Sequence, residues 1–316
     1  MVGQVLGHYC IEAKIGEGQF SVVYKGRDIR LNRLVAVKVL KENHSQDNAT
    51  WGRLLCEAKI ASTLCHPNVC TLFDIGEEQD VNYVVFEFVE GKTLRTILEC
   101  GPLPVRTVLL YGMQIAEAKA HIHGAGILHG DMKSSNIMVT PAGRIKVIDF
   151  GLATIIQEEK VKQHNATASS TQEIGWLAGT LPYMAPELLR GETATTQSGV
   201  WSLGIVLFEM LTGQFPFVGH TPFELGMEIM TGRIKPLPVG IPMGLRGIVH
   251  RCLVRDRKRR YCSAAEVFNH LHSEFISFEV RSVLANRQQP QDQGRWSERV
   301  ASALMRLSML FFNKGR

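Results

Sequence analysis

Residues 129–136 read HGDMKSSN, and residues 145–151 read IKVIDFG. The first stretch supplies the carboxylate of Asp131, the amine of Lys133 and the amide of Asn136, and the second adds the carboxylate of Asp149. Carboxylate and amide oxygens are hard ligands that suit Mg²⁺, and a lysine ammonium pairs with phosphate oxygens. The two stretches therefore contain the side chains from which a site for a metal-bound phosphate group is built.

The segments on either side of these stretches differ in the spacing of their apolar residues. Between Tyr9 and Phe88, short runs rich in Val and Ile alternate with Gly and polar turns, and one helical stretch spans residues 50–64. After Gly91 the apolar residues recur at helical spacing, in segments 105–123, 200–212, 245–254 and 263–272. The pattern predicts an α+β protein with a small β-rich N-terminal lobe, a larger and mostly helical lobe, and a ligand site between them.

The overall composition is that of a soluble globular protein. Of the 316 residues, 45% are hydrophobic and 21% are charged, which is sufficient for a two-lobed core and a tail. The cysteines are scattered, without a C-x-x-C pair, which predicts reduced thiols in the cytosol. The first residues lack the basic start and apolar core of a secretion signal, so we expect a cytoplasmic location.

The longest apolar run and the distribution of charge argue against a membrane span and a nucleic-acid partner. Residues 200–211 contain Glu209 and are too few to cross a bilayer, so this run predicts a buried helix. The formal net charge is +5, and the residues from Val280 onward hold seven Lys/Arg and two Asp/Glu, so 7 − 2 = +5 accounts for the whole excess. The rest of the chain is formally neutral, which disfavours nucleic-acid binding.

Two features of the N-terminal lobe fit a phosphate ligand, although each also has a simpler structural explanation. Residues 16–23 read GEGQFSVV between two apolar runs, which predicts a hairpin whose glycines let backbone N–H groups approach phosphate oxygens. Lys38 ends the apolar run VAVK, and Glu57 on the following helix can hold the Lys38 ammonium toward phosphates. An ordinary loop and two unrelated surface charges are the alternative interpretations.

The set of motifs is more specific than any one of them. HGDMKSSN, Asp149-Phe150-Gly151 and Ala185-Pro186-Glu187 occur in the order and spacing of the signature motifs of the protein kinase family. The chain resembles this family from Tyr9 to Phe275, and it is most similar to the Ser/Thr type and to bacterial eukaryotic-like kinases. The resemblance implies a bilobal protein-kinase-like fold that transfers the γ-phosphate of ATP to Ser or Thr hydroxyls of proteins, the chain itself included.

The resemblance also implies a role for each site residue. Asp131 would accept the proton of the substrate hydroxyl, Lys133 would neutralise charge on the transferred phosphoryl group, and Lys38 would bind the ATP phosphates. Asn136 and Asp149 would hold Mg²⁺, with Mn²⁺ as an alternative ion. The ATP site as a whole would comprise Ile15, Gly16, Gly18, Val23, Ala36, Lys38, Glu57, Phe86, Glu87 and Val89.

Three further details follow from the same resemblance. Backbone groups of Glu87 and Val89 would hydrogen-bond the edge of adenine, and Thr93 replaces an acidic residue that often contacts the ribose. Glu187 would pair with Arg260, the last residue of the basic run 256–260. A nucleic-acid patch is the alternative interpretation of that basic run, and simple core packing is the alternative for the apolar members of the ATP site.

The sequence departs from the family pattern at two glycines. Gly130 stands where most regulated kinases carry an arginine that binds a phosphate on the activation segment, so we expect activity that does not need phosphorylation at Thr167, Ser169, Ser170 or Thr171. Gly199 stands where the family usually has an aspartate that hydrogen-bonds the catalytic-loop backbone. Its absence predicts a looser loop, and Gly199→Asp is expected to raise thermal stability or turnover.

Two other functions remain open at this point. Small-molecule phosphotransferases of the aminoglycoside type often carry His-Gly-Asp, but Lys133, Asp149-Phe150-Gly151 and Ala185-Pro186-Glu187 favour a protein kinase. A pseudokinase that binds ATP or a partner as a scaffold is the non-enzymatic alternative. Gly199 keeps it open, whereas the catalytic residues argue against it.

The ends of the predicted domain and the histidines complete the sequence predictions. The kinase domain is expected at 8–276, with lobes at about 8–88 and 89–276, followed by a linker at 277–294. Residues 295–316 predict a basic amphipathic helix that docks on the kinase or a partner, or else on a membrane surface. His121 and His123 are expected near a helix end, with His129 under Phe150, rather than as a metal cluster.

Overall fold

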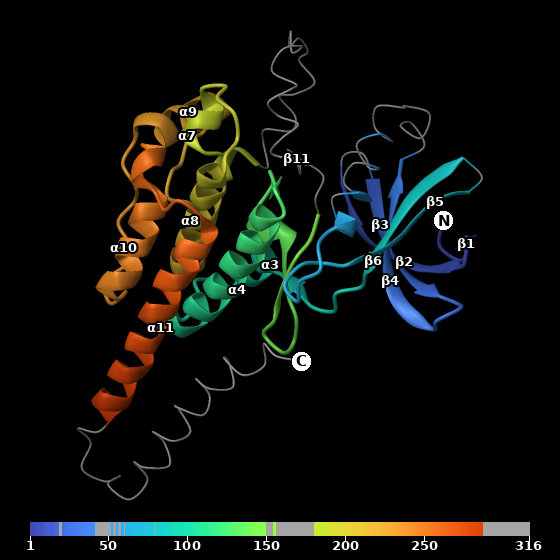
Figure 1. Ribbon diagram of the computed structural model, residues 1–316, viewed down its shortest axis with the longest axis horizontal. Coiled ribbons are helices and arrows are strands. Elements are labelled where there is room, and N and C mark those ends of the chain that lie inside the picture. Colours follow the sequence, from blue (N-terminus) through green and yellow to red (C-terminus); the bar gives the residue numbers. More distant parts are fainter. Residues whose placement is uncertain are drawn as a thin grey trace, which may run out of the picture.

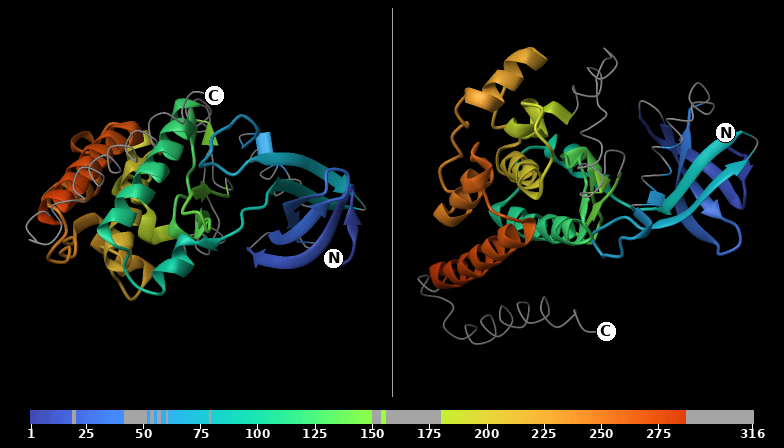
Figure 2. Two further views of the ribbon diagram at one scale, coloured as in Figure 1. Left: turned by 90° about the horizontal axis from the view of Figure 1, so that it is seen from below. Right: turned by 45° about the horizontal axis from the view of Figure 1, so that its top comes forward.

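The computed structural model describes residues 1–18, 21–41, 52, 55, 58–59, 61–78, 80–149, 154–155 and 180–286. These residues form a β-rich lobe, which contains the N-terminus, and a helical lobe (Figures 1 and 2). The segment that follows residue 87 connects them. The predicted α+β bilobal fold is confirmed.

The N-terminal lobe is an antiparallel sheet with the strand order β1-β2-β3-β4-β6-β5. The described positions within the predicted helix at 50–64 are helical from residue 52 to residue 62. The strands are β1 Val5–Leu6, β2 Tyr9–Glu17, β3 Ser21–Asp28, β4 Arg33–Leu40, β5 Leu72–Glu78 and β6 Val81–Glu87.

Strand β4 presents different residues to the two faces of this sheet. One face packs into a small core with residues of β1, β2 and β6, and β4 contributes to it Val35, Val37 and Val39. Successive side chains of a strand point to opposite faces, so Ala36 and Lys38 lie on the other face. Phe86, the partner of Ala36 on β6, belongs to the core cluster that continues into the helical lobe. The face that carries Lys38 is therefore the face turned toward that lobe.

The C-terminal lobe consists mainly of helices, and α11 packs along α4 (Figure 1). The helices are α3 Leu94–Leu98, α4 Val105–Gly124, α7 Pro186–Leu189, α8 Thr196–Thr212, α9 Pro222–Thr231, α10 Met243–Cys252 and α11 Ala264–Asn286. Short 3₁₀ turns are η1 Ser134–Asn136, η2 Leu181–Tyr183 and η3 Arg257–Arg259. A small sheet joins β7 Lys92–Thr93, β9 Ile137–Val139 and β10 Ile145–Val147, and a second pairs β8 Ile127–Leu128 with β11 Thr154–Ile155.

Helix α8 forms the centre of this lobe. Thr195 and Ser198 make a reciprocal capping box at its N-terminus, and Gly213 ends it with a φ of 68°, a left-handed conformation that favours glycine. Residues 200–211 are all buried, so the predicted buried helix is confirmed, with Glu209 inside it. Within the described ranges, no helix is both long enough and apolar enough to cross a membrane.

Helix α11 corrects the predicted end of the domain. The sequence predicts a linker from residue 277, but α11 continues to Asn286. The prediction is wrong for residues 277–286 because Phe278 packs against the core and Glu279 pairs with Arg106 of α4 at 2.8 Å. The remainder of the predicted linker and the predicted tail at 295–316 lie outside the described residues.

Candidate active site

The catalytic loop is the segment between β8 and β9, and it holds the predicted catalytic carboxylate. Asp131 is 8% exposed, and Nδ2 of Asn136 donates to its backbone carbonyl at 2.9 Å and to its carboxylate at 3.0 Å. Lys133 Nζ lies 2.7 Å from Asp131 Oδ2, and the hydroxyl of Thr180 donates to Oδ1 at 2.9 Å. The structure thus brings Asp131, Lys133 and Asn136 together, as the sequence predicts.

Asp149 follows strand β10 and links the two lobes. The N–H of Ile148 donates to the Asn136 carbonyl at 2.9 Å, which places Asp149 beside the catalytic loop. Lys38 Nζ of β4 lies 3.0 Å from Asp149 Oδ1. Asp149 has a φ of 63°, an uncommon and strained conformation for a residue other than glycine, and such strain concentrates at functional sites.

Asn136 and Asp149 fit the requirements of a divalent metal. The hydrogen bonds from Nδ2 of Asn136 to Asp131 orient the amide, so that its oxygen is the atom offered to a ligand. The side chain of Asp149 is 43% exposed, which leaves its carboxylate accessible. An amide oxygen and a carboxylate are ligands that Mg²⁺ accepts together with phosphate oxygens.

The glycine-rich stretch forms a hairpin, as predicted. Gly16 of β2 pairs with Val23 of β3, and the N–H of Gly18 donates to the Ser21 carbonyl at 2.8 Å to close the turn. Val23 in turn pairs with Lys38 of β4, so the hairpin adjoins the lysine that contacts Asp149. Ile15, at the mouth of the hairpin, is half exposed. The other predicted or quoted positions in these motifs, Gln19, Phe20, Glu57, Phe150 and Gly151, lie outside the described residues.

The end of β6 and the residues after it limit which backbone groups can contact adenine. The N–H of Glu87 donates to the Thr71 carbonyl at 2.8 Å, and its carboxylate pairs with Lys146 at 2.7 Å. The Glu87 carbonyl and the backbone of Val89 are therefore the groups that this segment can offer to a purine edge. Thr93, where the family often has an acidic residue, accepts a hydrogen bond from the Thr96 N–H at 3.1 Å and caps α3.

A buried carboxylate that the sequence analysis did not assign anchors the catalytic loop. Glu209 of α8 is 1% exposed and accepts hydrogen bonds from Ser134 Oγ at 3.0 Å and from the Tyr183 hydroxyl at 2.7 Å. Arg95 of α3 completes the cluster, with its Nη1 atom 3.2 Å from Oε1 of Glu209. Burial, together with the charge of Glu209, raises the pKa of Tyr183 above its ordinary range, so the phenol stays protonated as a donor. A single acidic residue in the apolar run 200–211 was the signal for this role.

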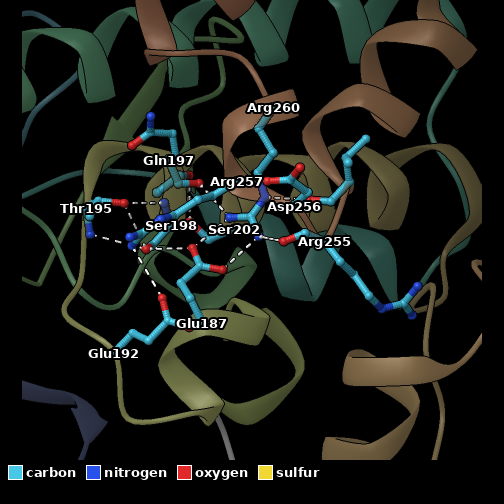
Figure 3. Close-up of polar contacts among 12 residues, drawn as sticks. Glu187, Glu192, Thr195, Gln197, Ser198, Ser202, Arg255, Asp256, Arg257 and Arg260 are labelled. Atoms are coloured by element: carbon cyan, nitrogen blue, oxygen red, sulfur yellow. Dashed lines mark hydrogen bonds and ion pairs between the residues drawn. The ribbon is translucent and has the colours of Figure 1, made fainter.

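The predicted pair of Glu187 and Arg260 is confirmed. Both carboxylate oxygens of Glu187 accept hydrogen bonds from the Arg260 guanidinium at 2.7 Å, and both side chains are fully buried (Figure 3). Arg260 also donates to the carbonyls of Val254, Gln197 and Arg255. Burial raises the pKa of Glu187, but the hydrogen bonds and charge of Arg260, together with hydrogen bonds from its own backbone and from Ser198, hold that pKa below its ordinary value. The pair fixes α7, which follows the segment that carries Thr180, against α8 and η3.

The space beside Gly199 is filled by side chains from another helix. A Cβ built on Gly199 lies 2.6 Å from Lys119 Cε and 3.0 Å from the His123 ring, both of which belong to α4. A larger residue therefore enters this space only if Lys119 and His123 shift. The sequence predicts a looser loop because residue 199 lacks a carboxylate, whereas the structure occupies the region with a lysine and a histidine. His123 lies in the last turn of α4, as predicted.

The backbone conformation of Gly130 explains part of the departure from the family pattern at this position. Its φ of 74° lies in the left-handed region, which glycine adopts freely and residues with a Cβ adopt at a cost of about 1 kcal/mol. A glycine at this position removes strain from the catalytic loop. The loop therefore has less need of an aspartate at 199 to hold its backbone.

We expect Gly130→Ala to lower the free energy of unfolding by about 1 to 2 kcal/mol, because the methyl group forces strain into the loop. Urea unfolding followed by circular dichroism measures this change. Gly124→Ala is the matched control, since Gly124 lies in α4 without a positive φ and has open space around its Cβ position. Equal stability of Gly130→Ala and the original protein would contradict the role assigned to Gly130.

Comparison with known proteins agrees with this geometry. The protein kinase domain family matches residues 9–273. The chain is 36% identical over 268 residues to the serine/threonine-protein kinase PrkC of Bacillus subtilis, covering 84% of this chain and 40% of that protein. It is 36% identical over 276 residues to a probable serine/threonine-protein kinase of Clostridium perfringens, covering 86% of this chain and 39% of that protein.

A third relative gives the same result. The serine/threonine-protein kinase PknB of Mycobacterium tuberculosis is 34% identical over 263 residues, which is 80% of this chain and 40% of that protein. The chain thus spans about two fifths of the length of the curated relatives that it matches. Since the family match extends over both lobes and includes the catalytic loop, the chain belongs to the protein kinase family.

Proposed function

We propose that this chain is an ATP-dependent protein kinase that phosphorylates serine or threonine hydroxyls of protein substrates. The observation that carries the proposal is the convergence of Lys38 with Asp149 and of Lys133 and Asn136 with Asp131 around the junction of the lobes. Three bacterial relatives, two named serine/threonine-protein kinases and one named a probable kinase of this type, support the same substrate class.

The residues divide the proposed reaction between them. Asp131 accepts the proton of the substrate hydroxyl as that oxygen bonds to the γ-phosphorus, and the bond from this phosphorus to the bridging oxygen breaks to release ADP. Lys133, 2.7 Å from Asp131, supplies positive charge to the phosphoryl oxygens. When the substrate arrives, its hydroxyl takes the place of the Thr180 hydroxyl as a donor to the Asp131 carboxylate.

The residues of the same site would also bind ATP and its metal ion. Asn136 and Asp149 would hold Mg²⁺, or Mn²⁺ in its place, which neutralises the phosphate charge. Lys38 now pairs with Asp149 at 3.0 Å, so nucleotide phosphates would enter between oppositely charged groups that are already in place. Ala36 and Val23 lie on the strands that carry or adjoin Lys38 and would enclose the adenine.

The test is phosphate transfer from labelled ATP with Mg²⁺, measured on the chain alone and with a generic protein substrate. We expect label on serine or threonine, located by mass spectrometry, and roughly 10²- to 10⁴-fold slower labelling with Asp131→Asn. A parallel assay offers aminoglycosides as acceptors. Transfer to those compounds in place of protein would support a small-molecule phosphotransferase, and ATP binding without any transfer would support a scaffold. Either result would overturn the proposal.

A further inference from the structure

A cavity of about 60 Å³ lies beneath the catalytic loop, apart from the residues assigned to ATP. It is bounded by α4, by the catalytic loop at Gly130, by the segment around Thr180 and by the N-terminal part of α8. A water molecule needs roughly 10 to 15 Å³ of such space, so the cavity can hold a group of several heavy atoms. The lining includes Lys119, His123, Thr195, Ser198, Gly199 and Ser202.

Lys119 is a buried cation on the wall of this cavity. It is 2% exposed, and within the described residues it makes no ion pair or side-chain hydrogen bond. Among the described residues that line the cavity there is no aspartate or glutamate. Burial lowers the pKa of Lys119 to about 7, because the ammonium is removed from water without a counter-charge. Buried charges in proteins are usually paired, so this lysine lacks the partner that it would normally have.

His123 adds a second unsatisfied polar group to the same wall. Its two ring nitrogens are buried, and neither has a hydrogen-bond partner in the described part of the chain. Burial, and then the neighbouring Lys119, lowers the pKa of His123 to about 3, so the ring is neutral near pH 7 and offers one N–H donor. Nearly all buried polar groups in proteins are hydrogen-bonded, and two exceptions side by side point to a missing ligand.

Gly199 lines this cavity with backbone atoms alone. It contributes no side chain, and a Cβ at this position would already crowd Lys119 and His123. The face of α8 that lines the cavity carries the hydroxyls of Ser198 and Ser202, which already donate to Glu187 and to the Gly199 carbonyl. The result is a pocket with the Lys119 ammonium and a His123 donor on its wall, and no described lining residue carries a carboxylate.

We propose that this cavity binds a compact oxyanion, of the size of sulfate or phosphate, against Lys119 and His123. The anion supplies the counter-charge that the lysine lacks. It also accepts hydrogen bonds from the Lys119 ammonium and the His123 N–H, which are otherwise unsatisfied. The oxyanion is either free in solution or attached to the chain as a phosphorylated side chain, and the experiment below separates the two sources. The site lies under the catalytic loop, so its occupancy acts on the backbone at Gly130.

Binding at this site is linked to the protonation of Lys119. Near pH 7 the two described histidines around the lysine stay neutral, since burial lowers the pKa of His129 to about 4 and that of His123 to about 3. From α8 only hydroxyls face the lysine, and Glu187 of α7 is paired with Arg260. The ammonium fraction of Lys119 falls roughly 30-fold between about pH 6 and about pH 8.5, so anion affinity falls by the same factor.

The first experiment measures the melting temperature in the presence of sulfate, whose charge does not change in this pH range. Sodium gluconate, a bulkier anion, keeps the ionic strength constant. We expect millimolar sulfate to raise the Tm by roughly 5 °C near pH 6 and by much less near pH 8.5. The unphosphorylated state of the sample is verified by mass spectrometry.

Variants separate this site from general salt effects. Lys119→Met should lose the response to sulfate, whereas Lys258→Met, at an exposed lysine of η3, should keep it. Gly199→Asp places a carboxylate beside Lys119 and should also lose the response, and Gly199→Ala controls for the added Cβ. A sulfate response of equal size in Lys119→Met, or no response of the original protein at either pH, would overturn the proposal.

The second arm tests a phosphate carried by the chain. The protein is incubated with ATP and Mg²⁺, or with a purified active kinase if it does not phosphorylate itself, and its phosphorylation is quantified. If the attached phosphate is the occupant, the phosphorylated protein has a raised Tm and no longer responds to sulfate. Lys119→Met phosphorylated to the same extent then shows no rise. If phosphorylated and unphosphorylated proteins respond to sulfate alike, the occupant is a free oxyanion.

Discussion

Asp131→Asn is expected to reduce the rate of phosphate transfer by roughly 10²- to 10⁴-fold, the range associated with loss of a general base. The amide cannot accept the hydroxyl proton, although it has nearly the same shape. Asp131 also receives hydrogen bonds from Asn136 and Thr180 and an ion pair from Lys133, and an asparagine oxygen can keep some of these contacts. We therefore expect the loss to appear in kcat, measured with labelled ATP over a range of substrate concentrations.

A matched variant and a binding assay support the interpretation of that loss. Lys92→Met changes an exposed lysine of β7 and should leave the rate unchanged. Nucleotide affinity of Asp131→Asn, measured by titration calorimetry, should stay within a few-fold of the original, since Lys38 and Asp149 are intact. If the variant retained full turnover, Asp131 would not be the base, and the proposed division of roles would be wrong.

Arg260→Met is expected to lower the free energy of unfolding by about 3 to 5 kcal/mol, the usual effect of removing one partner of a buried ion pair. The change leaves the carboxylate of Glu187 buried without the guanidinium that donates to both of its oxygens. It also removes donors from the backbone carbonyls of Gln197, Val254 and Arg255, and a cation that lies over the Trp201 ring. Urea unfolding followed by tryptophan fluorescence measures the change.

A partly exposed arginine of the adjacent turn η3 provides the control. Arg257 lies 3.5 Å from Glu192, and its side chain is 40% exposed, so Arg257→Met should alter stability by no more than about 1 kcal/mol. Replacing both Glu187 and Arg260 by apolar residues should cost less than Arg260→Met alone, because no unpaired charge is then buried. An Arg260→Met protein as stable as the original would show that the pair does not hold α7 in place.

The two glycines of the catalytic region have a joint physical explanation. A left-handed backbone at Gly130 is unstrained only in glycine, and the absence of a side chain at Gly199 makes room for Lys119 and His123. The strain that Gly130 avoids lessens the need for a residue at 199 that holds the loop backbone. The structure consequently weakens the argument that Gly199 alone marks an inactive scaffold, because the loop remains anchored by Glu209 through Ser134 and Tyr183.

The sequence alone determined the fold class and the order of the lobes, and it predicted main site residues that the structure brings together in one loop. It could do so because these properties depend on local information: apolar spacing distinguishes the sheet from the helices, and short motifs place Asp131, Lys133 and Asn136 in one loop. The pairing of Glu187 with Arg260 was also predicted, although only through resemblance to a family. The role of Glu209 was not, since one acidic residue in an apolar run does not reveal its partners.

Only the tertiary structure decided which side chains surround a position, such as Gly199, at which the sequence departs from the family pattern. Lys119 and Gly199 are far apart in the sequence, and their contact depends on how α4 packs against α8. The same holds for the end of α11, where Phe278 packs against the core and Glu279 pairs with Arg106 beyond the predicted boundary. Both features depend on which side chains from distant segments fill the same volume. Close packing in the folded protein decides this, whereas periodicity and motifs describe one segment at a time.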